Sequence, residues 1–399
     1  MLSALETDRA RLAGLDAQNQ DLENSIAALR LEQERVQQER NLVQLRLDAY
    51  KYPVLTLPNE IVAEIFIRVL PVYPRCPPLT GILSPISLTH ICRLWREIAI
   101  STPVPWRAVA LAHNADVSSQ RQAHIIDLWL KRSSSCLLSI NVDIAYAERV
   151  EASKVLSSVT ARHSRWEYLK LVYDTSGLPA IEDSMPMLRH LHLELIEVNP
   201  LSFREVPLLR SVVLDDFAAS SIVLPWAQLT SLALRRVFLH ECAPLLKQTS
   251  NLVHCDLQLS FVEYDHSDIT LPCLESLALN IPDPLGPVCQ YLTLFITPAL
   301  RRLRIPEQFL GPDAIRSLTA FITTSGCELQ ELRITGKRSI PSKSYYREAL
   351  HSVGRLSFSR NYYDQPPSEF DVAIPVVIES DSDSDLSYCT SSDSEEEDY

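Results

Sequence analysis

The chain has 399 residues, of which 46% are hydrophobic, and a formal net charge of −13 at pH 7. This length predicts two or three domains, and a count of only 8 glycines argues against glycine-rich phosphate loops. Most of the net charge comes from nine acidic residues within residues 379–399. Because no basic stripe is present elsewhere, we expect no nucleic-acid binding.

The cysteines and the N-terminus indicate a compartment. Nine cysteines are present, and no pair has the CxxC spacing of a zinc site. In a chain of this length they are typical of buried free thiols in a reducing compartment. The N-terminus is charged from Glu6 to Arg11, unlike a signal peptide with its apolar core. No run of 18 apolar residues is present that could span a bilayer. The sequence therefore predicts a cytoplasmic or nuclear protein that makes no use of a membrane.

Residues 1–50 have the pattern of a heptad helix, because they contain no proline and a single glycine. Apolar residues fill the d positions: Leu15, Leu22, Leu29, Val36 and Val43. The a positions are mixed: Leu12, Asn19, Ile26, Gln33, Arg40 and Leu47. The pattern predicts a coiled-coil helix that self-associates through residues 1–50. The alternative is an amphipathic helix that packs against its own domain.

Residues 52–107 predict a small all-α domain. Tyr52 precedes Pro53, which ends the first helix. A short buried helix then starts near Asn59, with apolar residues at positions 61, 62, 65, 66 and 69. A proline-rich break follows, and apolar residues at 88, 91, 95 and 98 predict a second helix over 86–99. Pro103 and Pro105 close the segment.

Three pieces of this segment together resemble the F-box motif. They read, in order, Leu57-Pro58-x-Glu60-Ile61-x-x-x-Ile65-Phe66, then Leu88-x-x-Ile91-Cys92-Arg93-x-Trp95-Arg96-x-Ile98-Ala99, then Pro105-Trp106. With the heptad helix ahead of them, they also resemble the N-terminal layout of the large F-box families of mushroom-forming fungi. The proline-rich insertion at 71–85 departs from the family, which usually has a tighter turn there.

The resemblance implies a role in a cullin-RING (SCF-type) ubiquitin ligase. F-box helices dock on a Skp-family adaptor, which links them to a cullin scaffold, and the rest of the chain holds a substrate protein. Motif matching assigns the adaptor-binding surface or its core to Leu57, Pro58, Glu60, Ile61, Ile65, Phe66, Ile91, Cys92, Trp95 and Trp106. The sequence does not divide contact residues from core residues within this set.

A repeat fills residues 117–358. One phrase returns eight times, an apolar residue followed by further apolar residues three and five positions later. It starts at Trp166, Leu188, Leu209, Leu229, Leu252, Leu274, Leu300 and Leu329. The spacings of 20 to 29 residues are those of leucine-rich repeats. They predict an α/β fold overall, with a solenoid whose strands stack into a parallel sheet. We also expect a strand over 136–142 and helices over 123–131, 288–295 and 312–322.

The repeat register predicts a partner-binding face. Residues that alternate with the strand leucines point to the opposite, concave side of the sheet, where we expect them to be exposed. The candidates are Tyr168, His190, His192, Asp215, Arg235, His254, Asp256, Arg302, Arg304 and Arg333. This mixture of aromatic, acidic and basic side chains suits a protein ligand better than a small molecule. A sheet face that is merely solvated is the alternative.

Catalytic and metal sites are not expected. His190, His192 and Glu194 share one strand face, but residues two apart on a flat strand seldom converge on one ion. GxSxG, HExxH and kinase motifs are absent from the sequence. We therefore expect no enzyme activity, no cofactor and no metal.

Residues 359–399, acidic from 379, predict a disordered tail. Several of its serines have an acidic residue three positions later, a pattern typical of acidophilic kinase sites, and a purely solubilising tail is the alternative. Two functions fit the whole chain. One is a non-catalytic, substrate-recognition adaptor of a ubiquitin ligase. The other is a coiled-coil, leucine-rich-repeat scaffold that binds a protein partner without ubiquitin chemistry.

Overall fold

The computed structural model describes residues 2–50, 53–111, 119–143, 156–173, 184–195, 201–203, 205–215, 222–260, 268–281, 291–336 and 343–359. The chain divides into two compact units, Met1–Val62 and Ala63–Tyr399. The predicted disordered tail lies outside the described residues except for Ser359, which belongs to the last strand instead.

The first unit consists mainly of α1 (Leu2–Ala49), followed by the 3-10 helix η1 (Pro53–Thr56). The predicted N-terminal helix is thus confirmed, while its pairing with a second copy stays a prediction. Side chains one turn apart bridge its surface, as between Arg35 and Glu32, whose charged atoms are 3.1 Å apart. Every residue from 5 to 49 is exposed to solvent.

Short helices begin the second unit. They are α2 (Asn59–Val69), which starts in the first unit, α3 (Pro85–Leu88), α4 (Arg93–Ser101), the 3-10 helix η2 (Val104–Trp106) and α5 (Ser119–Arg132). The single helix predicted over 86–99 is wrong, because the chain breaks between α3 and α4. The Thr89 hydroxyl donates to the Ile86 carbonyl at 2.7 Å, and the Cys92 sulfur accepts from the Trp95 amide at 3.4 Å. These side chains satisfy backbone groups that a continuous helix would have paired.

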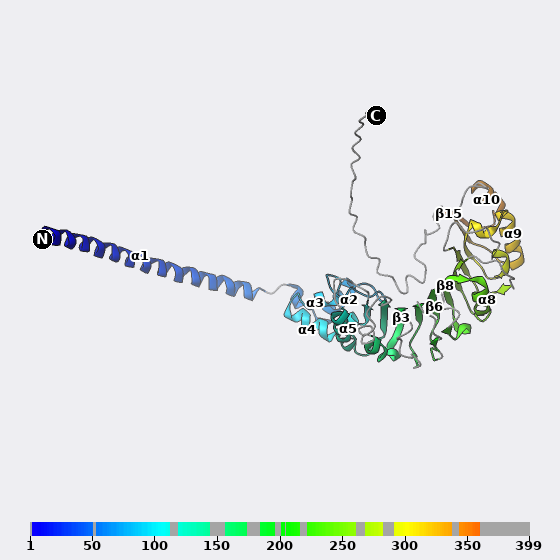
Figure 1. Ribbon diagram of the computed structural model, residues 1–399, viewed down its shortest axis with the longest axis horizontal. Helices are drawn as coiled ribbons and strands as arrows, with labels where there is room; N and C mark the ends of the chain where they lie inside the picture. Colours follow the sequence, from blue (N-terminus) through cyan, green and yellow to red (C-terminus); the bar gives the residue numbers. More distant parts are fainter. Residues whose placement is uncertain are drawn as a thin grey trace, which may run out of the picture. The chain divides into compact units, whose positions relative to one another are not determined.

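An eleven-stranded parallel sheet forms the body of the second unit, which confirms the predicted parallel sheet (Figure 1). Its strands, in spatial order, are β1 (Ala108–Leu111), β2 (Leu138–Asp143), β3 (Trp166–Tyr173), β4 (His190–Leu195), β6 (Ser211–Asp215), β8 (Ser231–Phe238), β9 (His254–Ser260), β11 (Ser276–Asn280), β13 (Arg302–Pro306), β14 (Glu331–Thr335) and β15 (Arg355–Ser359). The repeat phrases lie on or just before β3 to β14. The phrase did not predict β1 or β15.

Shorter elements connect the strands. They are the parallel pairs β5 (Leu201–Ser202) with β7 (Ile222–Val223) and β10 (Ile269–Thr270) with β12 (Phe295–Ile296), the 3-10 helices η3 (His163–Arg165), η5 (Trp226–Gln228), η6 (Tyr291–Leu294) and η7 (Glu307–Leu310), and the helices α8 (Leu239–Leu246), α9 (Ala314–Ser325) and α10 (Lys343–Ala349). The helix predicted at 312–322 is confirmed as α9. The helix predicted at 288–295 is confirmed only as the 3-10 helix η6, since Phe295 already belongs to β12 and residues 288–290 lie outside the described residues.

The core lies on the leucine face of the sheet, which we define as the face that carries the repeat leucines. Leu232, Leu257 and Leu277 occupy neighbouring strands and are at most 1% exposed. Because a strand cannot bury its own apolar residues, each row of leucines is covered by the next strand and by the connecting elements. Figure 1 shows α8, α9 and α10 on the same side of the sheet. We call the opposite side of the sheet the polar face. Because the core and these helices lie on the leucine face, the polar face is the candidate partner-binding surface.

Candidate partner-binding surface

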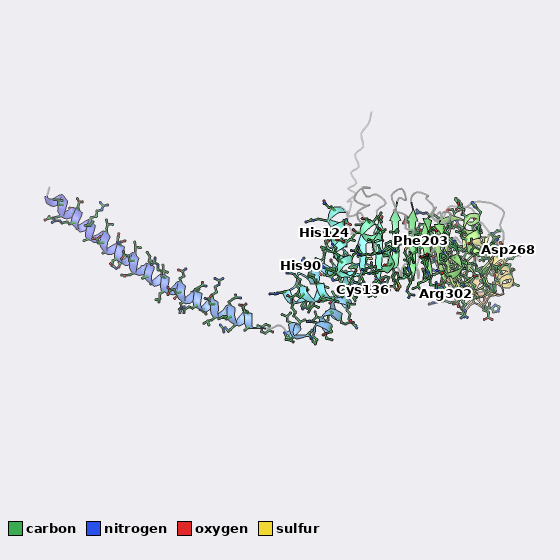
Figure 2. All side chains as sticks on the ribbon, turned by 90° about the horizontal axis from the view of Figure 1, so that it is seen from below. His90, His124, Cys136, Phe203, Asp268 and Arg302 are labelled. Atoms are coloured by element: carbon green, nitrogen blue, oxygen red, sulfur yellow. The ribbon has the colours of Figure 1, made fainter. Side chains whose placement is uncertain are left out.

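The polar face is arranged in rows because the parallel strands pair in register. One row begins the strands and contains Tyr168, His190, Ser211, Ser231, His254, Ser276, Arg302 and Glu331. The next row, two residues further along, contains Lys170, His192, Val213, Ala233, Asp256, Ala278, Arg304 and Arg333. These two rows contain eight of the ten predicted residues, and the other two, Asp215 and Arg235, pair with each other two residues further along the same strands. Figure 2 shows Cys136 and Arg302 along one edge of the sheet, where the strands begin.

The expected exposure of this face is wrong at two of the ten positions. His192 and Asp215 are only 6% and 5% exposed, and their neighbours Lys170 and Ser211 are also buried. Strands lie about 4.8 Å apart, so long polar side chains in the same row cover one another. Tyr168, His190, Arg235, His254, Asp256, Arg304 and Arg333 are half-buried, and Arg302 is exposed. Most of the charged side chains on this face are therefore covered, at least in part, by other side chains of the sheet.

A charged cluster joins three neighbouring strands, β4, β6 and β8. His192 Nε2 lies 3.4 Å from Asp215 Oδ2, and Arg235 Nε lies 3.7 Å from the other carboxylate oxygen. Arg236 Nη2 lies 3.5 Å from a carboxylate oxygen of Glu194. These residues are far apart in sequence, and only the strand register brings them together. The cluster links the strands by electrostatic attraction, in addition to the backbone hydrogen bonds.

Burial sets the protonation of this cluster. It lowers the pKa of His192, which the Asp215 carboxylate opposes only in part, so the imidazole is neutral near pH 7. Burial alone would raise the pKa of Asp215, but the His192 hydrogen bond and the Arg235 charge outweigh it and leave the pKa below its usual value. Burial also lowers the pKa of Lys170, against the attraction of nearby carboxylates such as Glu194.

The cluster also contains a donor set that a metal could use. His192, Glu194 and Asp215 each offer one ligand atom, and these atoms lie within 4.8 Å of one another. A histidine nitrogen with two carboxylates suits a divalent transition metal. However, Arg235 and Arg236 already face the two carboxylates, so their charge is balanced without an ion. The trio weighed from the sequence included His190, which the structure directs elsewhere.

His190 belongs to an aromatic ladder at the β3 end of the face. Its ring stacks on Tyr168, with centroids 4.4 Å apart and planes 2° from parallel. Tyr73 meets Tyr168 edge to face at 5.5 Å, and the Arg107 guanidinium lies 3.8 Å from the centroid of the Tyr73 ring. Burial, aided by the positive charge of Arg189, lowers the pKa of His190 to about 4. The ladder is therefore neutral at His190 and positive at Arg107.

The proline-rich insertion contributes Tyr73 to this ladder and is hydrogen-bonded to the sheet. The Tyr73 hydroxyl donates to a Glu167 carboxylate at 2.8 Å, and the Ser139 hydroxyl donates to the Pro74 carbonyl at 2.7 Å. Burial and the neighbouring Glu167 raise the pKa of Tyr73, which keeps the hydroxyl protonated as a donor. Sequence reasoning treated residues 71–85 only as a departure from a motif and missed Tyr73. Its signal was an aromatic residue between prolines, which fix the backbone around it.

A second polar network crosses the sheet further along. Asn280 Nδ2 on β11 donates to Asp256 on β9 at 2.6 Å. Arg304 on β13 donates to the other oxygen of the same carboxylate at 3.1 Å. Val213 and Ala233, both buried, separate this network from the first cluster. The polar face is thus two charged clusters with a small apolar patch between them.

The residues matched to the F-box motif fall into two groups. In the first unit, Leu57, Pro58, Glu60 and Ile61 are all exposed. In the second unit, Ile91 is exposed, Ile65, Cys92 and Trp95 are half-buried, and Phe66 and Trp106 are fully buried. The structure thus separates surface residues from core residues, a division that the sequence left open.

Phe66 and Trp106 are held by directional contacts. The Phe66 ring meets Trp95 edge to face, with centroids 5.1 Å apart. Trp106 packs edge to face on Trp129 at 5.8 Å and donates its indole hydrogen to the Ala99 carbonyl at 2.8 Å. A buried indole requires such an acceptor. These contacts give both residues a structural role inside the helical segment.

Other exposed apolar side chains lie near the matched residues in sequence. Within the described part of the second unit they include Val69, Val72, Ile82, Leu83 and Ile100. Exposed apolar residues that gather in one segment mark an interaction surface more often than isolated ones do. A cavity of about 340 Å³ lies in the same segment and is lined by Leu70, Tyr73 and Arg107, among others.

The cysteines that the structure describes do not form a site. All seven cysteines within the described ranges are free, and Cys242 and Cys255 are buried. Burial raises the pKa of Cys242 to about 12, which keeps its thiol protonated and unreactive. The prediction of buried thiols is wrong for Cys273, which is exposed.

Comparison with models of known protein families found no match, and comparison with curated proteins found no similar sequence. Among the helices that the structure describes, none is both long enough and apolar enough to cross a membrane. The residues of the chain and their geometry therefore carry the functional inference.

Proposed function

We propose that the chain is a non-catalytic, substrate-recognition adaptor of a cullin-RING (SCF-type) ubiquitin ligase. An F-box at residues 52–107 docks on a Skp-family adaptor, which connects the chain to a cullin scaffold. A leucine-rich-repeat solenoid at residues 117–358 holds the substrate protein on its polar, concave face. The chain contributes proximity between substrate and enzyme, and the ubiquitin chemistry takes place on other subunits.

The observation that carries this proposal is the division of the motif residues between surface and core. Leu57, Ile61 and Ile91 are 36%, 49% and 58% exposed, while Phe66 and Trp106 have no exposed surface. An apolar side chain left in water costs about 25 cal/mol per Å² of its area, so a partner that covers these residues is favoured. Core residues at the other motif positions keep the helices in shape for that contact.

The repeat region supports the second half of the proposal. Its parallel strands pair in register, and its polar face presents acidic, basic and aromatic side chains over many strands. A protein ligand of standard interface size, about 800 Å² on each partner, suits such a broad face.

Adaptor binding can be tested with two isoleucines of the same segment. Ile91 lies in the motif and Ile100 lies outside it, and both are exposed. In the full-length chain, Ile91→Ala and the double variant Leu57→Ala with Pro58→Ala should weaken binding of a purified Skp-family adaptor about tenfold or more, measured by calorimetry. Ile100→Ala, the matched control, should leave affinity within about twofold. Equal affinity for all three variants would refute the docking assignment.

The second candidate function is a scaffold that binds a protein partner through the same sheet face without ubiquitin chemistry. The exposed heptad helix favours it, since α1 offers a second interaction surface that an adaptor does not require. Pull-down of the full-length chain with mass spectrometry separates the two functions. Skp-family and cullin peptides support the adaptor, whereas a recovered partner without them supports the scaffold.

A further inference from the structure

The heptad seam of α1 is open to solvent along its length. The d-position side chains Leu15, Leu22, Leu29, Val36 and Val43 are between 42% and 70% exposed. Figure 2 shows side chains standing out around this helix from end to end. With 48 residues and a rise of about 1.5 Å per residue, the helix is about 72 Å long. An apolar stripe of this length requires a partner that follows it.

Polar residues interrupt the seam at a positions and restrict what that partner is. Asn19, Gln33 and Arg40 all occupy this position, whereas every d position from 15 to 43 is apolar. In the single chain, Asn19 Nδ2 donates to Glu23 at 3.4 Å, a long and exposed hydrogen bond that is easily exchanged. A binding partner must therefore satisfy the polar side chains at these three positions along the helix.

A second copy of the same helix does so in only one orientation. In a parallel, in-register pair, each a residue faces its own copy, so Asn19 faces Asn19 and Gln33 faces Gln33. In the antiparallel pair that aligns the seams, each a residue faces a d residue. Asn19 then faces Val36 and Gln33 faces Leu22, which buries amide groups against hydrocarbon. Unpaired burial of such groups is costly, so the parallel pair is favoured.

The flanking charges agree with the parallel pair. Arg11 and Asp16 occupy the g and e positions that meet between parallel helices, and their charges are opposite. Arg40 at a lies beside Glu39 at g of the facing helix, which supplies the carboxylate that its guanidinium needs. The remaining g–e pairs between residues 18 and 44 contain no like charges.

We propose that α1 pairs with α1 of a second copy of this chain in a parallel, in-register, two-stranded coiled coil whose register is fixed by Asn19. The pair places two polar sheet faces in one particle. A ligand with two binding sites is then held more tightly than by one copy, through effective concentration alone. This inference does not depend on the adaptor role, because the seam lies outside the segment matched to the F-box.

The first experiment compares two leucines that lie two positions apart and differ in heptad position. Leu29 is at d and Leu31 is at f, and both are more than two-thirds exposed in the single chain. Sedimentation equilibrium of the full-length chain should give about twice the 45.1 kDa chain mass. Leu29→Asp should give the single-chain mass, and Leu31→Asp should leave the dimer intact. A single-chain mass for the unaltered protein at high micromolar concentration would overturn the proposal, as would dimers unaffected by Leu29→Asp.

The second experiment tests orientation and register. Cys76 is the first native cysteine, so Leu12→Cys, at another a position, introduces the only thiol in α1 and leaves Asn19 in place. Facing a positions approach closely enough for a disulfide in a parallel, in-register pair. In the antiparallel pair aligned above, the two thiols lie tens of Å apart, at about 1.5 Å per residue. Oxidation should therefore give a disulfide-linked dimer, and a reductant should separate it into single chains. A matched Ser25→Cys variant at g should cross-link much less. No cross-link in a protein that still sediments as a dimer would refute the parallel register.

Discussion

The two faces of the eleven-stranded sheet are made from the same strands but are stabilised in different ways. On the leucine face, residues such as Leu232 and Leu277 are buried by neighbours that need no particular orientation. On the polar face, Asp215 and Asp256 are paired with cations or amide groups from other strands of the sheet. Burial on the leucine face therefore depends on side-chain volume, whereas burial on the polar face depends on the pairing of charged and polar groups.

The leucine face should show the largest effect. Leu277 is 1% exposed and lies in register between Cys255 and Leu303. We expect Leu277→Ala to lower the free energy of unfolding by about 3 kcal/mol, since it removes buried methyl groups and leaves a cavity. Leu277→Met, which conserves volume, should cost less than about 1.5 kcal/mol. Urea denaturation measures both, and equal costs would show that volume does not dominate on this face.

The leucine face could be predicted from the sequence because its signal is local. The phrase of apolar residues three and five positions apart fixes which side chains point inward, and the repeat of that phrase predicts the parallel sheet. The pairing of Asp256 with Arg304 could not be predicted, because 48 positions separate them and the contact depends on register across β11. The same holds for Tyr73, which reaches Glu167 across 94 positions.

The helical segment shows the same limit. The sequence predicted apolar positions over 59–69 and 86–99, but not which of them face solvent. Ile91 is exposed because the chain leaves the helix between α3 and α4, where Thr89 and Cys92 satisfy backbone groups with their side chains. Helical periodicity assumes an unbroken helix, so it could not reveal this break. Exposed and core residues of this segment can therefore be told apart only in the three-dimensional structure.

Removing a charged side chain from the polar face should lower the free energy of unfolding less than removing a leucine from the leucine face. The loss grows with the number of its partners that are buried. Asp215→Ala leaves Lys170 buried without one of its carboxylates, while Arg235 is partly exposed and can be hydrated. We expect a loss of about 2 kcal/mol in the free energy of unfolding at pH 7, below the full cost of breaking a buried pair. Asp215→Asn, which keeps the shape, should lose nearly as much.

The pH dependence of this loss provides the control. The folded-state pKa of Asp215 lies below its ordinary value of 3.8, so its stabilisation is present above that pH and is lost as pH falls through the folded-state pKa. The unaltered protein and Asp215→Ala should therefore converge in stability only at strongly acidic pH. A constant difference down to that range would show that lost packing, rather than lost charge, causes the effect.

Exchanging two charges separates pairing from partner binding. Asp256→Arg alone places like charges together, and Arg304→Asp alone does the same, so each should lower the free energy of unfolding by about 1–2 kcal/mol. The double exchange restores opposite charges and should recover at least half of that loss. Affinity for a partner captured by the full-length chain should stay low in all three variants. Recovery of that affinity by the double exchange would mean that the pair only shapes the sheet.

The smallest effect on stability should come from Arg302, which lies on the same strand as Arg304 but is exposed. Arg302→Ala should change the free energy of unfolding by less than about 0.5 kcal/mol, because exposed charges are well hydrated in the folded and the unfolded chain. Arg304→Ala should cost more, since it leaves Asp256 with one donor fewer. For the rate of association with an acidic partner surface, the order should reverse, so that changes at Arg302 have a larger effect than changes at Arg304. An exposed cation at the edge of the sheet steers an approaching partner, so Arg302→Glu should slow association several-fold at low salt and much less at high salt. Stopped-flow association rates at two ionic strengths measure this difference. A salt-independent rate, or a larger rate effect from Arg304→Ala, would place partner recognition at the buried network instead of the exposed edge.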